Sequence, residues 1–149
     1  MGSGVRSATV EDWEAISRLN EGLGRHAGDG EIRASLARLL AGERDLVVVA
    51  ESDGRVVGWV HAAEREILGS GRRCEILGLV VGDAYRGRGT GRALVAVAEA
   101  WARGRGIAEV VVRSNIVRPE SHPFYERLGY ARSKTQHVYR KPIPTGGGV

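Results

Sequence analysis

The sequence predicts a single α/β domain with a mixed central sheet of six to seven strands and about four flanking helices. The 149-residue length fits one domain that buries a substantial core. Short valine-rich runs bounded by turns predict strands, paired as hairpins early in the chain and alternating with helices later. We expect the domain to span residues 5–141, with flexible ends at 1–4 and 142–149.

The first half of the chain is expected to form a strand at 5–8, two helices and a hairpin. Thr9 and Asp12 have capping-box spacing at the start of the first helix, and Asp29 is expected to cap the second. Apolar residues recur at helical spacing in both: Trp13, Ile16, Leu19 and Leu23, then Ile32, Leu36, Leu39 and Leu40. Asp53-Gly54 predicts a tight turn between strands at 46–50 and 55–64.

The second half is expected to alternate strands with helices. A turn at 69–71 leads into a strand at 73–81, and a helix follows with Leu94, Val97, Ala98 and Trp101 on one face. Next come a strand at 109–113 and a short helix at 119–128 that Gly129 ends. Two further strands are expected at 130–133 and 136–141.

Composition excludes several classes of protein and site. Cys74 is the only cysteine, so the chain has no internal disulfide and no cysteine-based zinc site. No spacing of histidines and carboxylates indicates a metal site, and no apolar run reaches the ~18 residues of a membrane helix. No signal-peptide pattern opens the chain, and we expect a cytoplasmic protein with no membrane partner.

The net charge of +4 is unevenly distributed. Residues 1–70 carry −4 and residues 71–149 carry +8. The basic half suits an anionic cofactor, nucleic acid or a solvated surface, but 5% aromatic residues leave few platforms for stacking bases, so no nucleic-acid partner is expected. The acidic half suits a cationic acceptor through Asp29, Glu31, Glu64 and Glu66.

A glycine-rich turn at 86–91 (Arg-Gly-Arg-Gly-Thr-Gly) joins the strand at 73–81 to the next helix. Glycines allow backbone N–H groups to converge, and the helix start adds the positive end of its dipole, so the turn predicts an anion site. The P-loop pattern is absent because Arg88-Gly89 replaces Lys-Ser/Thr, and Gly91 is one position too early for the dinucleotide fingerprint.

Leu79-Val80-Val81 followed by Arg86-x-x-Gly89-x-Gly91 resembles the acetyl-CoA signature of the GNAT N-acetyltransferases. Residues 124–130, Phe-Tyr-Glu-Arg-Leu-Gly-Tyr, resemble the late Tyr-x-x-x-Gly-Phe/Tyr element of that family. The expected order of elements over residues 5–141 fits as well. The resemblance implies a GNAT-like fold, acetyl-CoA as acyl donor and an N-acetyltransferase activity.

The resemblance also implies where coenzyme A binds. Pyrophosphate would lie on the amides of the turn, and the pantetheine arm would pair with the backbone of Leu79 and Val81. Arg92 and Arg118 are candidates for the ribose phosphate, and the long segment 116–123 makes His122 a candidate for cofactor or acceptor. The expected cofactor-binding residues are Leu79, Val80, Val81, Arg86, Gly87, Arg88, Gly89, Thr90, Gly91, Arg92, Asn115 and His122.

Acetylation of an amine needs a base for the ammonium proton and an acid for the departing thiolate. Glu75 is the expected base, on the face of its strand that carries Leu77 and Leu79; the alternative is a solvent-exposed glutamate. Tyr125 is the expected acid, and the alternative is a core residue. His26, His61 and His137 are interpreted as surface or packed histidines.

The leading functional hypothesis is acetylation of a primary amine on a small cationic acceptor, such as an aminoglycoside or polyamine, by direct attack in a ternary complex. Alternatives are a peptide N-terminus or lysine as acceptor, or a non-catalytic acyl-CoA-binding module. An RNA-binding protein is a further, disfavoured class. A homodimer is compatible with the resemblance.

Overall fold

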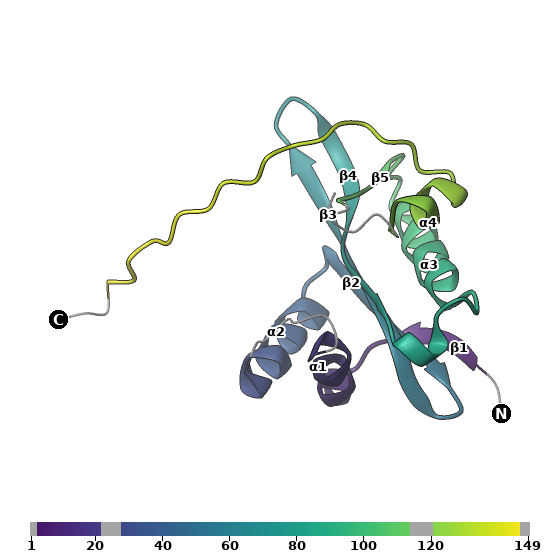
Figure 1. Ribbon diagram of the computed structural model, residues 1–149. Helices are drawn as coiled ribbons and strands as arrows, with labels where there is room; N and C mark the ends of the chain where they lie inside the picture. Colours follow the sequence, from purple (N-terminus) through teal and green to yellow (C-terminus); the bar gives the residue numbers. More distant parts are fainter. Residues whose placement is uncertain (1–2, 22–27, 114–120, 147–149) are drawn as a thin grey trace. The chain divides into compact units, whose positions relative to one another are not determined.

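The computed structural model describes residues 3–21, 28–113 and 121–146 (Figure 1). The chain forms two compact units, Met1–Arg113 and Ser114–Val149. In the described residues, the first unit holds the sheet and helices α1 to α3, and the second holds α4. None of the helices in these ranges has the length and apolarity needed to cross a bilayer.

The sheet of the first unit has five strands in the order β1-β2-β3-β4-β5. The strands are β1 (Ser3–Ser7), β2 (Asp45–Ser52), β3 (Arg55–Ile67), β4 (Gly71–Val81) and β5 (Val110–Val112). Neighbouring strands are antiparallel except β4 and β5, which are parallel. β1 begins before the predicted start, so Ser3 and Gly4 belong to the sheet and not to a flexible end.

Helices cover both faces of this sheet (Figure 1). A 3-10 turn, η1 (Val10–Asp12), leads into α1 (Trp13–Glu21), which lies beside α2 (Asp29–Ala41) on one face. α3 (Thr90–Gly104) lies on the opposite face. The mixed α/β architecture predicted from the sequence is therefore confirmed.

Of the two helix caps predicted from the sequence, the first forms and the second does not. The Thr9 N–H donates to Asp12 Oδ2 at 2.8 Å, so the predicted capping box forms. Arg6 fixes the same carboxylate with two 2.9 Å hydrogen bonds. The prediction for Asp29 is wrong, because the chain turns one residue earlier: Gly28 is the N-cap of α2, and its carbonyl accepts the first helical hydrogen bonds.

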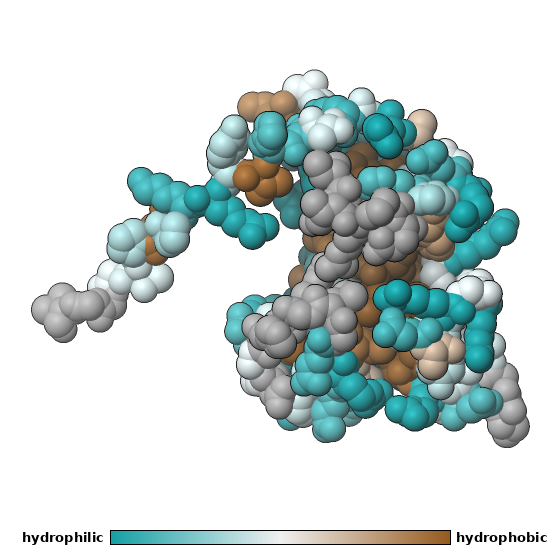
Figure 2. Space-filling model, in the orientation of Figure 1, coloured by the Kyte–Doolittle hydropathy of each residue, from teal (hydrophilic) through white to brown (hydrophobic). Residues whose placement is uncertain are grey.

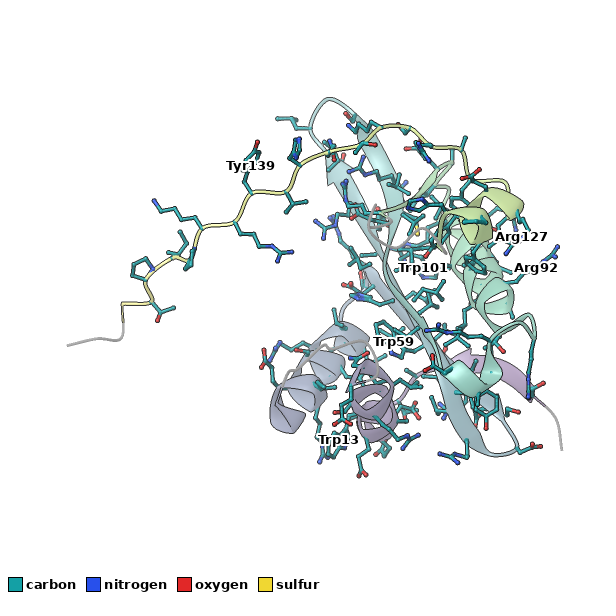
Figure 3. All side chains as sticks on the ribbon, in the orientation of Figure 1. Trp13, Trp59, Arg92, Trp101, Arg127 and Tyr139 are labelled. Atoms are coloured by element: carbon teal, nitrogen blue, oxygen red, sulfur yellow. The ribbon has the colours of Figure 1, made fainter. Side chains whose placement is uncertain are left out.

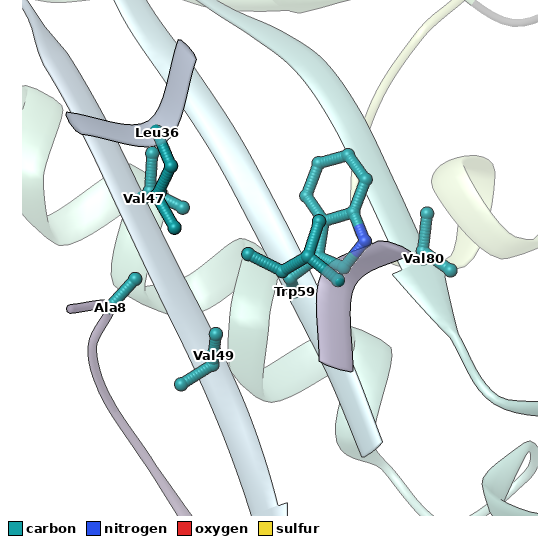
Figure 4. Close-up of a cluster of buried hydrophobic side chains, with 7 residues drawn as sticks. Ala8, Leu36, Val47, Val49, Trp59 and Val80 are labelled. Carbon is teal, nitrogen blue, oxygen red and sulfur yellow. The ribbon is translucent and has the colours of Figure 1, made fainter. Parts of the chain in front are cut away.

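The core between the sheet and α1/α2 is centred on Trp59 (Figure 4). Its buried members are Ala8, Ile16, Leu36, Val47, Val49, Trp59 and Val80. Three of the predicted apolar residues of α2, namely Ile32, Leu39 and Leu40, pack against this cluster from its edge. The outer sides of α1 and α2 are largely hydrophilic (Figure 2), as expected for helices that bury one stripe.

The second core lies between the sheet and α3. Leu94, Val95 and Ala98 of α3 are buried there, with Val60 of β3 also fully buried. Gly58 allows this helix to approach, because a Cβ at that position would lie 2.8 Å from the Val80 carbonyl oxygen and 3.3 Å from Leu94 Cδ1. A residue without a side chain is therefore required under the start of α3.

The β2–β3 turn forms as predicted. Asp53 and Gly54 both have left-handed backbone angles, φ +52° and +79°, which matches the tight hairpin turn that this dipeptide favours.

The second unit contains α4 (Ser121–Arg127), which ends at Gly129 with φ +94°, as predicted. The strands predicted at 130–133 and 136–141 do not form, so the sheet has five strands and not six to seven. A strand requires a hydrogen-bonded partner in addition to a suitable pattern. Here the segment forms no strand and is exposed, with Val138 and Tyr139 at 76% and 89% exposure.

Candidate active site

The edge of β4 opens where β5 ends. β5 pairs with β4 only as far as Val112, which lies beside Ile76. β4 continues for five more residues, and in the described part of the first unit no strand pairs with this edge beyond Ile76. Backbone groups along that stretch have no strand partner in these residues, which suits a ligand with peptide-like amides, although the Val81 carbonyl accepts a hydrogen bond from a side chain of the following turn.

The register of the β3–β4 ladder decides which residues present these groups. The Gly82 N–H donates to the Val57 carbonyl of β3 at 2.9 Å. Because the backbone direction alternates along an antiparallel ladder, Val80 also faces β3, whereas Leu79 and Val81 turn their backbone groups toward the open edge. Val80 was predicted to bind the cofactor, but its side chain lies in the core and its backbone faces β3.

The glycine turn follows this edge directly. After the 3-10 turn η2 (Asp83–Tyr85), Gly87 and Gly89 adopt φ +76° and +83°, and Gly89 is the N-cap of α3. Thr90 and Gly91 form the first turn of the helix, whose unpaired N–H groups and dipole favour an anion. The predicted strand–glycine turn–helix arrangement is present.

Arginines surround the turn. Arg86 donates from Nε to the Val81 carbonyl at 3.4 Å and pairs with Asp83 at 3.2 Å. The Arg88 guanidinium lies 5.4 Å from the centre of the Tyr85 ring. Arg92 is exposed on the first turns of α3 (Figure 3). These three side chains give the turn a positive surface.

A bulge in β4 places Glu75 on the other face from the one predicted. His61 lies opposite Gly78 and Ala62 opposite Ile76, so Leu77 is an extra residue in β4. One extra residue reverses the alternation of side chains. Glu75 therefore shares the α1/α2 face with Val80, and Leu79 lies on the other face. The prediction that Glu75 and Leu79 share a face is wrong, because it assumed a regular strand.

Two guanidinium groups hold the Glu75 carboxylate. Arg113 donates from Nε to Oε2 at 3.2 Å, and Arg73 approaches Oε1 at 3.7 Å. The Glu75 side chain is only 8% exposed. It is thus a buried, charge-paired carboxylate next to the bulge, and the alternative of a solvent-exposed glutamate is wrong.

A pocket of about 190 Å³ lies on the same face, between α1, α2, β2 and β3. It is lined by Ile16, Asn20, Glu31, Ile32, Ser35, Leu36, Leu39, Val47, Trp59 and His61. Figure 3 shows Trp59 on the side of the sheet that faces α1 and α2. The Trp59 Nε1–H donates to Asn20 Oδ1 at 3.2 Å, which fixes one wall.

The sequence interpretation missed a polar pair at this pocket. His61 Nε2 lies 2.8 Å from Asp45 Oδ1. The two residues are 16 positions apart in the chain and meet because the antiparallel β2–β3 ladder aligns them, Val47 with His61 and Asp45 with Ala63. The hairpin turn alone does not reveal this contact; only the register does.

The predicted acidic surface divides between the two faces of the sheet. Glu31 lines the pocket, but Glu64 lies opposite Cys74 on the α3 side, where Arg72 and Arg105 bind it at 2.7 and 2.8 Å. Hydrogen bonds from these arginines lower the pKa of Glu64 to about 2. Glu64 thus stays ionised with its charge compensated by two arginines, and Asp29 has no described side chain.

In the second unit, Tyr125 lies on α4 with its ring 5.1 Å from Phe124 and 6.0 Å from Tyr130. Burial raises the pKa of the Tyr125 phenol, which remains protonated at neutral pH. His122 lies on the same helix. Asn115 and Arg118 lie outside the described residues.

Comparison with known proteins identifies the family. Residues 11–130 match the model of the acetyltransferase (GNAT) family. The chain is 28% identical to aminoglycoside N(6′)-acetyltransferase type 1 of Stenotrophomonas maltophilia over 93% of both chains. It is 32% identical to an uncharacterized N-acetyltransferase, CT2212, of Chlorobaculum tepidum over 92% of this chain and 81% of that one.

Solved structures share the fold. The chain superposes on aminoglycoside acetyltransferase AAC(6′)-Iy, solved with a CoA-based bisubstrate analogue, with a TM-score of 0.86 and 21% identity, over 96% of this chain and 100% of that one. A complex of AAC(6′)-Iy with CoA superposes equally well. The chain is an acyltransferase and belongs to the GNAT family of acetyltransferases.

Proposed function

We propose that this protein acetylates a primary amine of a small cationic acceptor, by direct attack on acetyl-CoA in a ternary complex. The observation that carries the proposal is the continuity of two features. The open edge of β4 at Leu79 and Val81 leads directly into the left-handed glycine turn at the start of α3. One side of the strand thus offers peptide-like pairing and its end offers an anion site.

In this proposal the donor lies along that edge. The pantetheine amides pair with the backbone of Leu79 and Val81, as an added strand would. The pyrophosphate lies on the N–H groups from Gly87 to Gly91, with Arg86, Arg88 and Arg92 around it. Asn115 and His122 remain assigned to the donor by family resemblance alone.

The acceptor is proposed to enter the pocket lined by Trp59, His61 and Glu31. Its volume of about 190 Å³ is smaller than the ~300–1,000 Å³ of pockets that enclose whole drug-sized ligands. An aminoalkyl arm or a single amino-sugar ring suits this size, with the rest of the molecule in solvent. Glu31 favours a cation, and the aminoglycoside acetyltransferase relative supports this class of acceptor.

The chemistry follows from the acceptor's charge. An ammonium group has no lone pair, so Glu75, directly or through water, is proposed to remove its proton. The amine nitrogen then attacks the acetyl carbonyl carbon, the carbon–sulfur bond breaks, and the nitrogen releases its second proton to water, from which the tyrosine that protonates the thiolate regains its own. Tyr125 is proposed to protonate the departing CoA thiolate, and its raised pKa keeps that proton available at neutral pH.

The test is release of CoA thiol from acetyl-CoA across a panel of amines: kanamycin, neamine, spermidine, a lysine-containing peptide and a peptide with a free N-terminus. Turnover fastest with the aminoglycosides or spermidine supports the proposal. Turnover restricted to the peptides would assign the acceptor to the lysine or N-terminal class. CoA binding by calorimetry without turnover on any amine would instead leave a non-catalytic acyl-CoA-binding module.

A further inference from the structure

His61 and Asp45 form a pair that the proposed chemistry does not yet use. The imidazole Nε2 lies 2.8 Å from Asp45 Oδ1, and the two side chains are 19% and 25% exposed. An ionised carboxylate only accepts hydrogen bonds, so His61 Nε2 donates to Asp45. In a neutral ring with this tautomer the other ring nitrogen, Nδ1, is an unprotonated acceptor.

The His61 ring also lies close to the residues assigned to both substrates. His61 lines the pocket and is opposite Gly78, which has no side chain to cover it from β4. Gly78 immediately follows the bulge at Leu77, so His61 and Glu75 share a face on either side of it. The open edge of β4 begins at this same point. His61 thus lies between the acceptor pocket, which it lines, and the stretch of β4 that is assigned to the donor.

We propose that His61 Nδ1 accepts a hydrogen bond from the attacking amine and so directs the amine lone pair at the thioester carbon. Asp45 is the positioning residue that holds the neutral ring in its Nε2–H tautomer, with Nδ1 as the acceptor. This role rests on the proposed function, and it leaves proton removal to Glu75. His61 contributes orientation, which is a large part of catalysis of bimolecular reactions.

Protonation of His61 abolishes this role, because both ring nitrogens become donors and the ring acquires the charge of the ammonium substrate. The charged groups beside this ring are Asp45 on β2, at 2.8 Å, and Glu31 on α2, which lines the same pocket; Glu75 on β4 lies on the same face of the sheet, and α1 contributes Ile16 and Asn20 to the pocket.

Three variants separate the possibilities, assayed with the best amine of the panel. His61→Ala removes the acceptor and should lower kcat by about a hundredfold while leaving the KM for acetyl-CoA unchanged. His61→Asn keeps an acceptor oxygen near the position of Nδ1, so kcat should stay within about tenfold of the unaltered protein. Asp45→Asn permits the other tautomer and should lower kcat by about tenfold or more.

Nitrogen-15 NMR of the histidine side chains gives a readout that does not depend on turnover. In the unaltered protein His61 should show the Nε2–H tautomer, and Asp45→Asn should mix or reverse the tautomers. His137→Asn, at an exposed histidine of the second unit, is the matched control and should leave kcat and its pH profile unchanged.

The contrary outcomes are distinct. If the unaltered protein acetylates no amine, both the proposed function and this inference fail. If it is active, three results overturn this inference alone: unchanged kcat in His61→Ala, an Nδ1–H tautomer in the unaltered protein, or His61→Asn as inactive as His61→Ala. The last would indicate that His61 transfers a proton.

Discussion

Arg113 Nε donates a hydrogen bond to Glu75 Oε2 at 3.2 Å, which joins the residue after β5 to the middle of β4. The contact lies where the two strands part, since Val112 is the last residue of β5 that pairs with β4. Arg73 approaches the other carboxylate oxygen at 3.7 Å. The carboxylate is therefore fixed beside the open edge, on the face of the acceptor pocket.

Glu75→Gln should lower kcat by about two to four orders of magnitude, because the amide cannot remove the ammonium proton. Its affinity for CoA should change little, since CoA is assigned to the open edge and the glycine turn. Thiol release and calorimetry measure the two quantities. Glu43→Gln, at an exposed loop residue, is the control. A loss of CoA affinity as large as the loss of kcat in Glu75→Gln would show that Glu75 acts on the donor site.

Tyr125→Phe should lower kcat by about tenfold to a hundredfold, because the raised pKa of the phenol keeps it protonated and able to donate to the thiolate. KM for the amine should stay the same. Tyr139→Phe, at a residue that is 89% exposed, is the matched control. Unchanged turnover in Tyr125→Phe, with an unchanged melting temperature, would assign Tyr125 to the core.

Gly89→Ala should weaken CoA binding by about tenfold, because a side chain at φ +83° costs ~1–2 kcal/mol and displaces the N–H groups of the turn. Calorimetry with CoA measures this loss. Gly104→Ala, at the last residue of α3 with open space around it, should leave CoA affinity unchanged. The same affinity in both variants would contradict the anion site.

Gly58→Ala should destabilise the fold by about 1–3 kcal/mol, because the added methyl group would lie 2.8 Å from the Val80 carbonyl oxygen and 3.3 Å from Leu94 Cδ1. Urea unfolding measures the change. Gly4→Ala, in β1 with nothing within 4 Å of the added carbon, should be nearly neutral. An unchanged free energy of unfolding in Gly58→Ala would mean that α3 moves to accommodate the methyl group without loss of stability.

Asp12 makes the protein sensitive to acid. Hydrogen bonds from Arg6 lower the pKa of Asp12 in the folded state. The stability that this carboxylate contributes is present above its unfolded pKa of ~3.9 and is lost as the pH falls through the lower folded value. Asp12→Asn should therefore reduce the unfolding free energy at neutral pH and flatten its decline in acid. Glu11→Gln should keep that decline, and an unchanged curve for Asp12→Asn would contradict the role.

Local signals predicted most elements and the donor turn. Asp53-Gly54, the capping box at Thr9 and the strand–turn–helix around Gly89 each depend on a few neighbouring residues, whose backbone preferences are short-range. The prediction of two C-terminal strands was wrong because strand pairing is not local. Residues 130–141 include strand-like residues but have no partner strand in the described structure. The predicted face of Glu75 was wrong because the sequence of this strand carries no signature of a bulge.

The sequence by itself determined the α/β class and the position of the glycine turn, because these follow from spacing and from residues with special backbone freedom, and the resemblance of its motifs to known ones implied the family. Only the tertiary structure decided which side chains share a face. The extra residue at Leu77 brings Glu75 to the α1/α2 side, and the β2–β3 register brings Asp45 to His61. Side chains alternate with a period of two along a strand, so one unpaired residue is enough to reassign a site.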